Sequence, residues 1–399
     1  MHAQNLLILR KKTVFSLYLL SVLGLFFCVD SARAQQQDSS AVADSTLLKE
    51  LMQEMNPGTG ATAPAVQNQG TTIRSNANMN PDISVISDLR MHYDAQAERQ
   101  LDTYLNEIEF AFKSTIDPYA RADIYMSAHR HEDGHFAVVP EEAYLTTLAL
   151  PAKLQLKVGK FRSAFGRVNP IHPHALRTTD IPVMFENYFG ESLSDEGLSL
   201  SWLVPNPLDF YQELTIQATR GPDESPSFAY STKDKYLTLA HLKNFWDIND
   251  NATLELGLSG VTGPNETDFT TQIGGVDLTY KWKPLRYNTY HSFEFQTEAL
   301  FSKMKIAPNE SIETWAMYSM MSYQLSRRWY AGARFDYSNL PEDPDWVEKG
   351  YSAFLSWEAT EFQKVEIQFK RSTFEEEDAA NQFIIRSIFV IGTHGAHMY

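Results

Sequence analysis

The sequence is almost free of cysteine, with Cys28 as the one example among 399 residues. Cys28 lies in the first apolar run of the chain, so removal of that run leaves a protein without any thiol. Disulfide bonds, thiolate metal sites and cysteine nucleophiles are then excluded. Phe26 and Phe27 precede Cys28, where a lipid-modified cysteine would follow small residues, so we expect no lipid anchor there.

Short motifs of catalytic sites are largely lacking as well. The sequence contains no G-x-S-x-G, phosphate-binding glycine loop or C-x-x-C-H. Residues 131–135 match H-E-x-x-H, but they lie at a predicted outer hairpin, whereas metalloproteases carry this motif on a helix. No serine and histidine are singled out by an orienting Asn or Asp. Carboxylate pairs such as Glu107 with Glu109 and Glu141 with Glu142 are common on the inner walls of barrels. We therefore expect no enzyme, no catalytic residue and no resident cofactor.

The first 34 residues have the layout of a secretory signal peptide. Three basic residues, 10–12, precede an apolar run from Val14 to Val29, and the small-residue site Ala32-Arg33-Ala34 follows. The run is shorter than the ~20 residues that a membrane-spanning helix needs. We expect cleavage after Ala34 and export from the cytoplasm.

Negative charge dominates the sequence, whose formal net charge is −16. Removal of residues 1–34 takes away four basic residues and one acidic residue, which leaves 30 against 49 and a net charge of −19. Such an acidic chain repels nucleic acid, so no nucleic-acid partner is expected. Residues 35–80 are rich in small and polar types and are interpreted as a flexible periplasmic leader. A short helical pattern over 45–55 could instead bind a partner.

From Ile83 onward the chain alternates apolar and polar side chains in segments of roughly nine to fourteen residues. In one clear case Ile108, Phe110 and Phe112 alternate with Glu107 and Glu109. This period and length are typical of membrane barrel strands, which turn one face to lipid and the other to the lumen. The polar faces hold too much charge for the packed core of a soluble β-sandwich, so we expect them to face water inside a pore.

The segments predict an all-β fold over residues 81–399, a transmembrane antiparallel barrel of about sixteen strands, within a range of fourteen to eighteen. An even number places both ends of the chain on the periplasmic side. Short turns are expected near 116–118, 150–152, 205–207, 326–327 and 360–361, and longer outer loops near 94–103, 162–196, 221–234, 338–349 and 373–380. The predicted strand starts lie near residues 84, 104, 119, 136, 153, 197, 209, 235, 252, 271, 290, 313, 328, 350, 362 and 381.

In the final strand Phe383, Ile385, Phe389 and Ile391 share one parity, and that parity runs on to the terminal Tyr399. A last strand that ends in an aromatic residue is the signal that the barrel-assembly machinery recognises in membrane barrels. We expect this machinery, together with outer-membrane lipid, among the partners of the chain.

The longest predicted connection runs from Arg162 to Glu196 and follows the fifth strand. In sixteen-stranded porins the loop at this position folds into the lumen and sets the constriction, where charges select the ions that cross. The alternative is a loop whose charges are solvated or paired among themselves. Both signs of charge are present, so no ion preference is predicted. The candidate residues for pore constriction and selectivity are Arg162, Arg167, His172, His174, Arg177, Asp180 and Glu186.

Histidines gather near two predicted outer loops. Imidazoles with nearby carboxylates are competent zinc ligands, so the two loops could share one metal ion. The alternative is that these are solvated loop histidines. The candidate metal ligands are His129, His131, His135, His172 and His174.

The segment Leu156–Gly166, which reads LKVGKFRSAFG, resembles the V-G-K-F-x-x-x-F-G segment of the phosphate-selective porin superfamily. The stretches 169–176, 189–190, 195–197 and 391–399 also resemble a group of Bacteroidetes outer-membrane proteins, some labelled zinc-regulated TonB-dependent receptors. This resemblance implies a Gram-negative outer-membrane barrel over about residues 80–399. The chain is too short for the roughly 22 strands and plug of a TonB-dependent transporter. It also lacks a readable lysine ladder, so phosphate specificity is not implied.

These features together predict a porin-like outer-membrane channel, trimeric as such channels often are, through which small hydrophilic solutes or ions diffuse passively. Two alternatives are kept. One is a zinc-linked uptake or binding protein, which the histidines favour. The other is a structural or adhesive barrel whose lumen is filled.

Overall fold

The computed structural model describes residues 81–95, 100–130, 136–208, 210–222, 225–230, 235–375 and 378–392. The predicted signal peptide, the predicted leader, His131, His135 and the last seven residues lie outside this part of the chain. In the part described, no helix is both long and apolar enough to cross a membrane.

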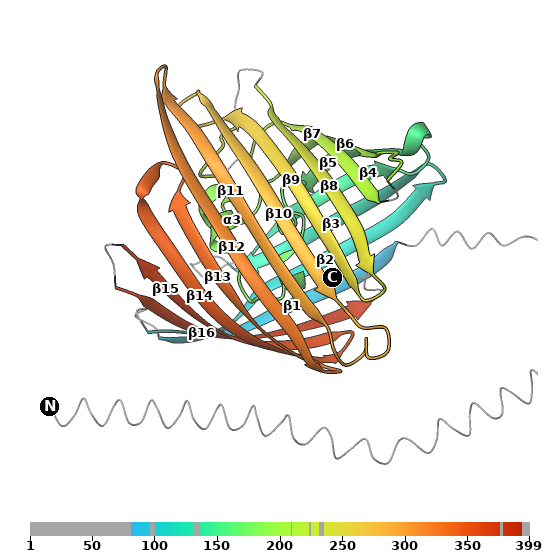
Figure 1. Ribbon diagram of the computed structural model, residues 1–399, viewed down its shortest axis with the longest axis vertical. Coiled ribbons are helices and arrows are strands. Elements are labelled where there is room, and N and C mark those ends of the chain that lie inside the picture. The colour runs from blue at the N-terminus through green and yellow to red at the C-terminus, as the bar shows by residue number, and fades with distance from the viewer. Residues whose placement is uncertain are drawn as a thin grey trace, which may run out of the picture. The chain divides into compact units, whose positions relative to one another are not determined.

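The described chain forms a closed ring of sixteen antiparallel strands in sequence order (Figure 1). Ring closure comes from the pairing of β1 with β16, in register from Ser84 opposite Gly392 to Asp94 opposite Gln382. The strands are β1 (Asp82–Asp94), β2 (Leu101–Asp117), β3 (Ala120–Arg130), β4 (Phe136–Thr147), β5 (Leu154–Arg162), β6 (Ser194–Leu203), β7 (Tyr211–Thr219), β8 (Leu237–Asn249), β9 (Ala252–Pro264), β10 (Thr270–Trp282), β11 (Phe293–Ala307), β12 (Glu310–Ser326), β13 (Trp329–Leu340), β14 (Asp343–Thr360), β15 (Gln363–Phe374) and β16 (Ala380–Gly392). The predicted fold class is confirmed.

The connections alternate between the two ends of the barrel largely as predicted, and every strand except β14 begins within three residues of its predicted start. The expected long loop over 338–349 is wrong, because β13 continues to Leu340 and β14 begins at Asp343. Asn339 supports the tight turn by donating its side-chain amide to the carbonyls of Pro344 and Trp346. The polar residues of 338–349 therefore belong to an extended hairpin and not to a loop.

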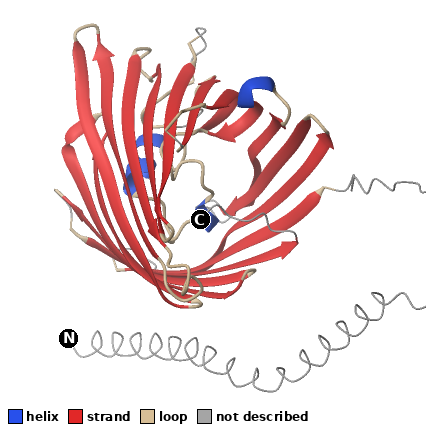
Figure 2. Ribbon diagram, turned by 45° about the vertical axis from the view of Figure 1, so that its right-hand side comes forward, coloured by secondary structure: helices blue, strands red, loops and turns tan. Residues whose placement is uncertain are grey.

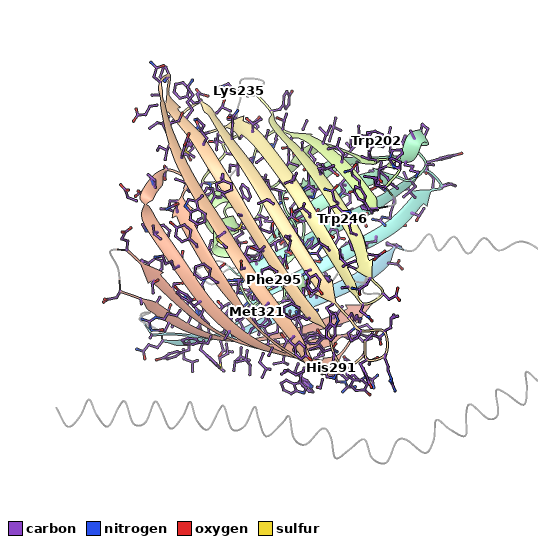
Figure 3. All side chains as sticks on the ribbon, in the orientation of Figure 1. Trp202, Lys235, Trp246, His291, Phe295 and Met321 are labelled. Atoms are coloured by element: carbon purple, nitrogen blue, oxygen red, sulfur yellow. The ribbon has the colours of Figure 1, made fainter. Side chains whose placement is uncertain are left out.

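The two faces of the wall differ as the alternation predicts. Apolar side chains on the outer face are exposed, including Leu258 (50%) at the middle of β9 and Phe301 (61%) on β11. Phe295 and Met321 lie opposite each other on β11 and β12 (Figure 3). Polar residues on the inner face are buried instead, among them Glu298. The apolar outer surface suits contact with hydrocarbon, whereas the inner surface carries polar and charged side chains.

The connection between β5 and β6, residues 163–193, folds back inside the barrel (Figure 2), and we call it the inner loop. It contains two short helices, η2 (Pro173–Ala175) and α3 (Val183–Phe189); another single turn, η1 (Pro151–Lys153), precedes β5. The connection after the fifth strand, the third on its side of the barrel, is therefore the one that folds inward, as predicted.

The inner loop buries an apolar face against the wall, and this corrects the expectation that the inner wall meets only water. Phe185 and Phe189 of α3 are fully buried. They belong to an apolar cluster, which we call the loop core, whose wall members are contributed mainly by β8 to β12. Near the β7–β8 connection the inward parity of β8 is itself apolar, at Leu237 and Leu239. The loop core contains Phe165, Met184, Phe185, Tyr188, Phe189 and Leu193 from the inner loop and Leu239, Val261, Ile273, Leu300 and Tyr318 from the wall.

The packing of the loop core allows a prediction of how much stability the inner loop loses when one buried ring is removed. Replacing Phe185 by Ala leaves a cavity and costs about 3–5 kcal/mol of local stability. We expect faster hydrogen exchange and faster proteolysis across 163–193. Replacing the exposed Phe301 by Ala is the matched control and leaves both unchanged. Equal exchange in the two variants would contradict a packed loop core.

Candidate functional site

The inner loop is held to the far wall of the barrel through its own backbone. The carboxylate of Glu298 on β11 accepts hydrogen bonds from the backbone N–H of Arg167 and of Val168, each 3.0 Å long, and from Tyr318 Oη at 2.6 Å. Gly166 has a φ of +60°, and a Cβ there would lie 2.0 Å from Glu298 Oε2. A glycine is therefore required for the loop to approach the carboxylate this closely.

A second anchor joins Asp180 of the inner loop to the wall at β13 and β15. Arg334 Nη2 lies 2.9 Å from Asp180 Oδ2, and Lys370 Nζ lies 3.0 Å from the same oxygen. Gln368 Nε2 donates to Asp180 Oδ1 at 2.6 Å. Burial acts to raise the pKa of Asp180, but Arg334 and Lys370 outweigh it and hold that pKa well below its usual range.

A third anchor uses a fully buried arginine on β16. Arg386 donates to Glu366 on the neighbouring strand and to the carbonyls of Pro173, Leu176 and Thr178. Carbonyls of an irregular loop need donors when they leave water, and one guanidinium supplies several. With the anchors on β11 and β13, this contact shows that the loop crosses the lumen and does not merely line one side.

Between the anchors lies a belt of partly exposed charges on the inner wall, which we call the charged belt. Arg167 pairs with Glu255 at 2.8 Å, and Arg177 pairs with Glu358 at 3.2 Å and packs over the ring of Tyr330 at 4.7 Å. Two lysines and another glutamate complete it. Its members are Arg167, Arg177, Lys243, Glu255, Lys281, Glu294 and Glu358.

A cluster of carboxylates and histidines covers the opposite side of the lumen, on β2 to β4, and we call it the acidic cluster. His172 lies 2.9 Å from Glu109, 3.2 Å from Glu141 and 2.7 Å from Glu142. Arg162 lies 3.2 Å from Glu141. Burial and Arg162 act to lower the pKa of His172, but the three carboxylates raise it well above its usual value. The members are Glu107, Glu109, His129, Glu141, Glu142, Arg162, His172 and His174.

A β-bulge makes the acidic cluster possible. Adjacent residues of a regular strand point to opposite faces, yet Glu141 and Glu142 both contact His172. The register between β3 and β4 shifts here, with Tyr125 opposite Glu142 and Met126 opposite Pro140, so Glu141 is the extra residue. Two neighbouring carboxylates thereby face the lumen together.

The structure separates the residues that the sequence proposed as one constriction set. Arg162, His172 and His174 join the acidic cluster, while Arg167 and Arg177 join the charged belt. Asp180 is an anchor, and Glu186 is exposed on α3. Most of these charges are therefore paired with the wall.

Of the proposed metal ligands, His129, His172 and His174 lie in the acidic cluster, and His131 and His135 lie outside the described residues. His129 Nε2 lies 2.8 Å from Glu141 Oε1. From the sequence, the four carboxylates of the acidic cluster were expected as pairs on the inner wall and were not joined to these histidines. The shared parity of Glu107 and Glu109 was a usable signal, whereas the bulge at Glu141 left none.

The Asp180 anchor predicts a pH-dependent attachment of the inner loop. Because the pKa of Asp180 is lowered on folding, its stabilisation is complete above the ordinary value of about 3.9 and is lost as pH falls toward the lowered pKa. Asp180→Asn should remove this dependence and, by breaking a largely buried pair, cost about 3–5 kcal/mol of loop stability. Hydrogen exchange at 178–181 between pH 2.5 and 7 measures both. Glu310→Gln, an exposed control at the start of β12, should match the parent chain; an unchanged pH profile for Asp180→Asn would refute the anchor.

Comparison with known proteins supports the fold. No family model matches the chain. An uncharacterised protein of Aquifex aeolicus is 29% identical over 341 residues, which cover 74% of this chain and 70% of that protein.

Solved structures with the same fold include OprB of Pseudomonas putida, at 8% identity and a TM-score of 0.58, over 81% of this chain and 97% of that one. The anion-selective porin from Comamonas acidovorans is 8% identical, with a TM-score of 0.54 over 78% and 99%. DcaP, an outer-membrane channel of Acinetobacter baumannii, is 9% identical, with a TM-score of 0.54 over 78% and 97%. At such low identity these likenesses concern the fold alone: the chain has the sixteen-stranded barrel fold of outer-membrane porins.

Proposed function

We propose that this protein is an outer-membrane channel through which small hydrophilic solutes or ions diffuse passively, and that it is not an enzyme. The observation that carries the proposal is the inner loop, anchored across the lumen of a closed barrel between a charged belt and an acidic cluster. A loop in that position narrows the path through the lumen while the barrel wall itself stays closed. The structural neighbours named as porins and channels support the same function.

The outer surface supports insertion into a membrane. Aromatic pairs lie on the barrel near both ends of the strands, as Trp315 with Tyr337 and Trp329 with Trp357. Such aromatic girdles mark the two lipid–water boundaries of bacterial barrels. Beyond Trp315, toward the turn between β11 and β12, the exposed outer face becomes charged at the Lys303–Glu313 pair. An apolar band between aromatic girdles is the surface that lipid requires.

The charges inside favour small polar solutes over large or apolar ones. The charged belt on β8 to β14 lies across the ring from the acidic cluster on β2 to β4. Because ions are weakly screened in a narrow lumen, this arrangement places a field across the path and orients dipolar solutes. We extend the proposal to a homotrimer, since OmpT of Vibrio cholerae, a neighbour with a TM-score of 0.53, is described in a trimer form.

Membrane insertion makes a prediction for the outer face. Leu258→Arg places a guanidinium at the middle of β9, where burial of a cation in lipid costs about 2–4 kcal/mol. We expect this loss of stability in urea titrations of barrels folded into vesicles. The control is Leu208→Arg, at an apolar residue that is 76% exposed in the β6–β7 connection. If both variants unfold at the same urea concentration as the parent, the membrane assignment fails.

Channel function is tested by single-channel conductance of the refolded protein in a planar bilayer with potassium chloride. We expect stable conductance steps and, for Glu186→Lys, a shift of the reversal potential in a salt gradient toward anion permeation. The matched control is Glu310→Lys, because Glu310 is exposed at the start of β12 and outside the lumen. A folded barrel that never conducts would overturn the proposal in favour of a filled structural or binding barrel.

A further inference from the structure

Three potential metal ligands of the acidic cluster turn their donor atoms toward one point. Glu109 Oε2 lies 2.9 Å from His172 Nδ1 and 3.5 Å from His174 Nδ1, and the three atoms lie within 4.8 Å of one another. Zinc–ligand bonds of about 2.0–2.1 Å in a tetrahedral site separate neighbouring ligand atoms by roughly 3.3 Å. The distances from Glu109 to the two histidines fit a first-row transition-metal site with these three ligands.

The positions of the three ligands are set by the fold. Glu109 lies on β2, and the two histidines flank Pro173 in η2 of the inner loop. Pro173 fixes its own φ, and the two rings lie 5.6 Å apart. All three side chains are at least four-fifths buried, with exposures of 2% for Glu109, 12% for His172 and 4% for His174. The donor atoms are therefore pre-arranged and shielded from bulk water.

A carboxylate behind His172 orients its ring. His172 Nε2 lies 2.7 Å from Glu142 Oε1, in hydrogen-bond geometry. When the ring carries its one proton on Nε2, the Nδ1 lone pair is directed at Glu109 Oε2, which lies 2.9 Å away. Metal-bound histidines are held in this way by an outer carboxylate. In that tautomer a cation bound between Nδ1 and the carboxylate takes the place that the second ring proton would otherwise fill.

The charge of the acidic cluster also calls for a cation. It contains four glutamates, at 107, 109, 141 and 142, all nine-tenths buried by side-chain exposure. Among the described side chains, Arg162 is the one arginine or lysine within ion-pair distance of them. Four carboxylates against one guanidinium leave an excess of three negative charges; a proton on His172 offsets one of them, and the remainder costs free energy at a buried site. A divalent cation removes most of that excess.

We infer that Glu109, His172 and His174 bind a divalent transition-metal ion of the zinc type, with Glu142 as the residue that orients His172. A second group, formed by Glu107, His129 and Glu141, has its own ligand atoms within 4.8 Å and shares the wall with the first. It includes only one nitrogen donor, so the first group is the better zinc site. Because the ion would join β2 to the inner loop, it would fix the loop at the acidic cluster.

The test uses the full-length protein, folded in detergent, and isothermal titration with zinc chloride. We expect one zinc per barrel in the parent chain, no binding at this site in Glu109→Gln or His174→Ala, and a 10–100-fold weaker affinity in Glu142→Gln. His291→Ala, in the β10–β11 connection, is the matched control and should bind like the parent. Glu109→Gln keeps the size of the side chain, and near-ultraviolet circular dichroism checks that each variant is folded.

The visible spectrum of bound Co²⁺ identifies the ligand set, because a four-coordinate site with nitrogen donors absorbs far more strongly than hexaaquo cobalt. We expect that spectrum in the parent and in His129→Ala, and its loss in Glu109→Gln. Absence of binding in the parent overturns the inference, as does binding that survives both Glu109→Gln and His174→Ala. Neither measurement requires an open pore, so a failure here is distinct from a failure of the proposed channel function.

Discussion

The pairing of β1 with β16 is the constraint on which the rest of the structure depends. Hydrocarbon offers no partner to a backbone N–H or C=O, so a sheet is tolerated there only when it has no free edge. Closure forces one face of every strand outward and the other inward, and period-two alternation follows from it. The enclosed space can then receive a long segment of irregular backbone without exposing that backbone to lipid.

The inner loop meets a similar requirement where it packs against the wall, because its backbone groups lose contact with water there. Charged side chains of the wall supply the hydrogen-bond partners. Glu298 accepts hydrogen bonds from two backbone N–H groups, and Arg386 donates to several carbonyls. Charged groups make stronger hydrogen bonds than neutral ones, and each anchor therefore outweighs much of the entropy lost in ordering the loop. The loop core adds apolar burial on the side of β8 to β12. Together they make the constriction a fixed part of the barrel.

The sequence could predict whatever depends on alternation and turn chemistry. Strand starts at Phe136 and Ala252 agree with the predicted positions, since the local pattern alone determines them. Failures came where tertiary contacts decide. The hairpin at Leu340–Asp343 has the composition of a loop but is paired, and the register shift that brings Glu141 beside Glu142 has no local signature. Several partners of the inner loop lie more than a hundred residues away in sequence, as Glu298 does from Arg167.

The distribution of anchors separates two kinds of charge in the lumen. At the Asp180 anchor the acid meets both Arg334 and Lys370, so its charge is fully compensated and its role is structural. At the acidic cluster four glutamates share Arg162, and the compensation is incomplete. Burying uncompensated charge is costly, and a protein gains no stability from it unless a proton or another cation is bound. The excess negative charge of the acidic cluster therefore serves to bind cations in the lumen, whereas the balanced pairs of the Asp180 anchor hold the inner loop in place.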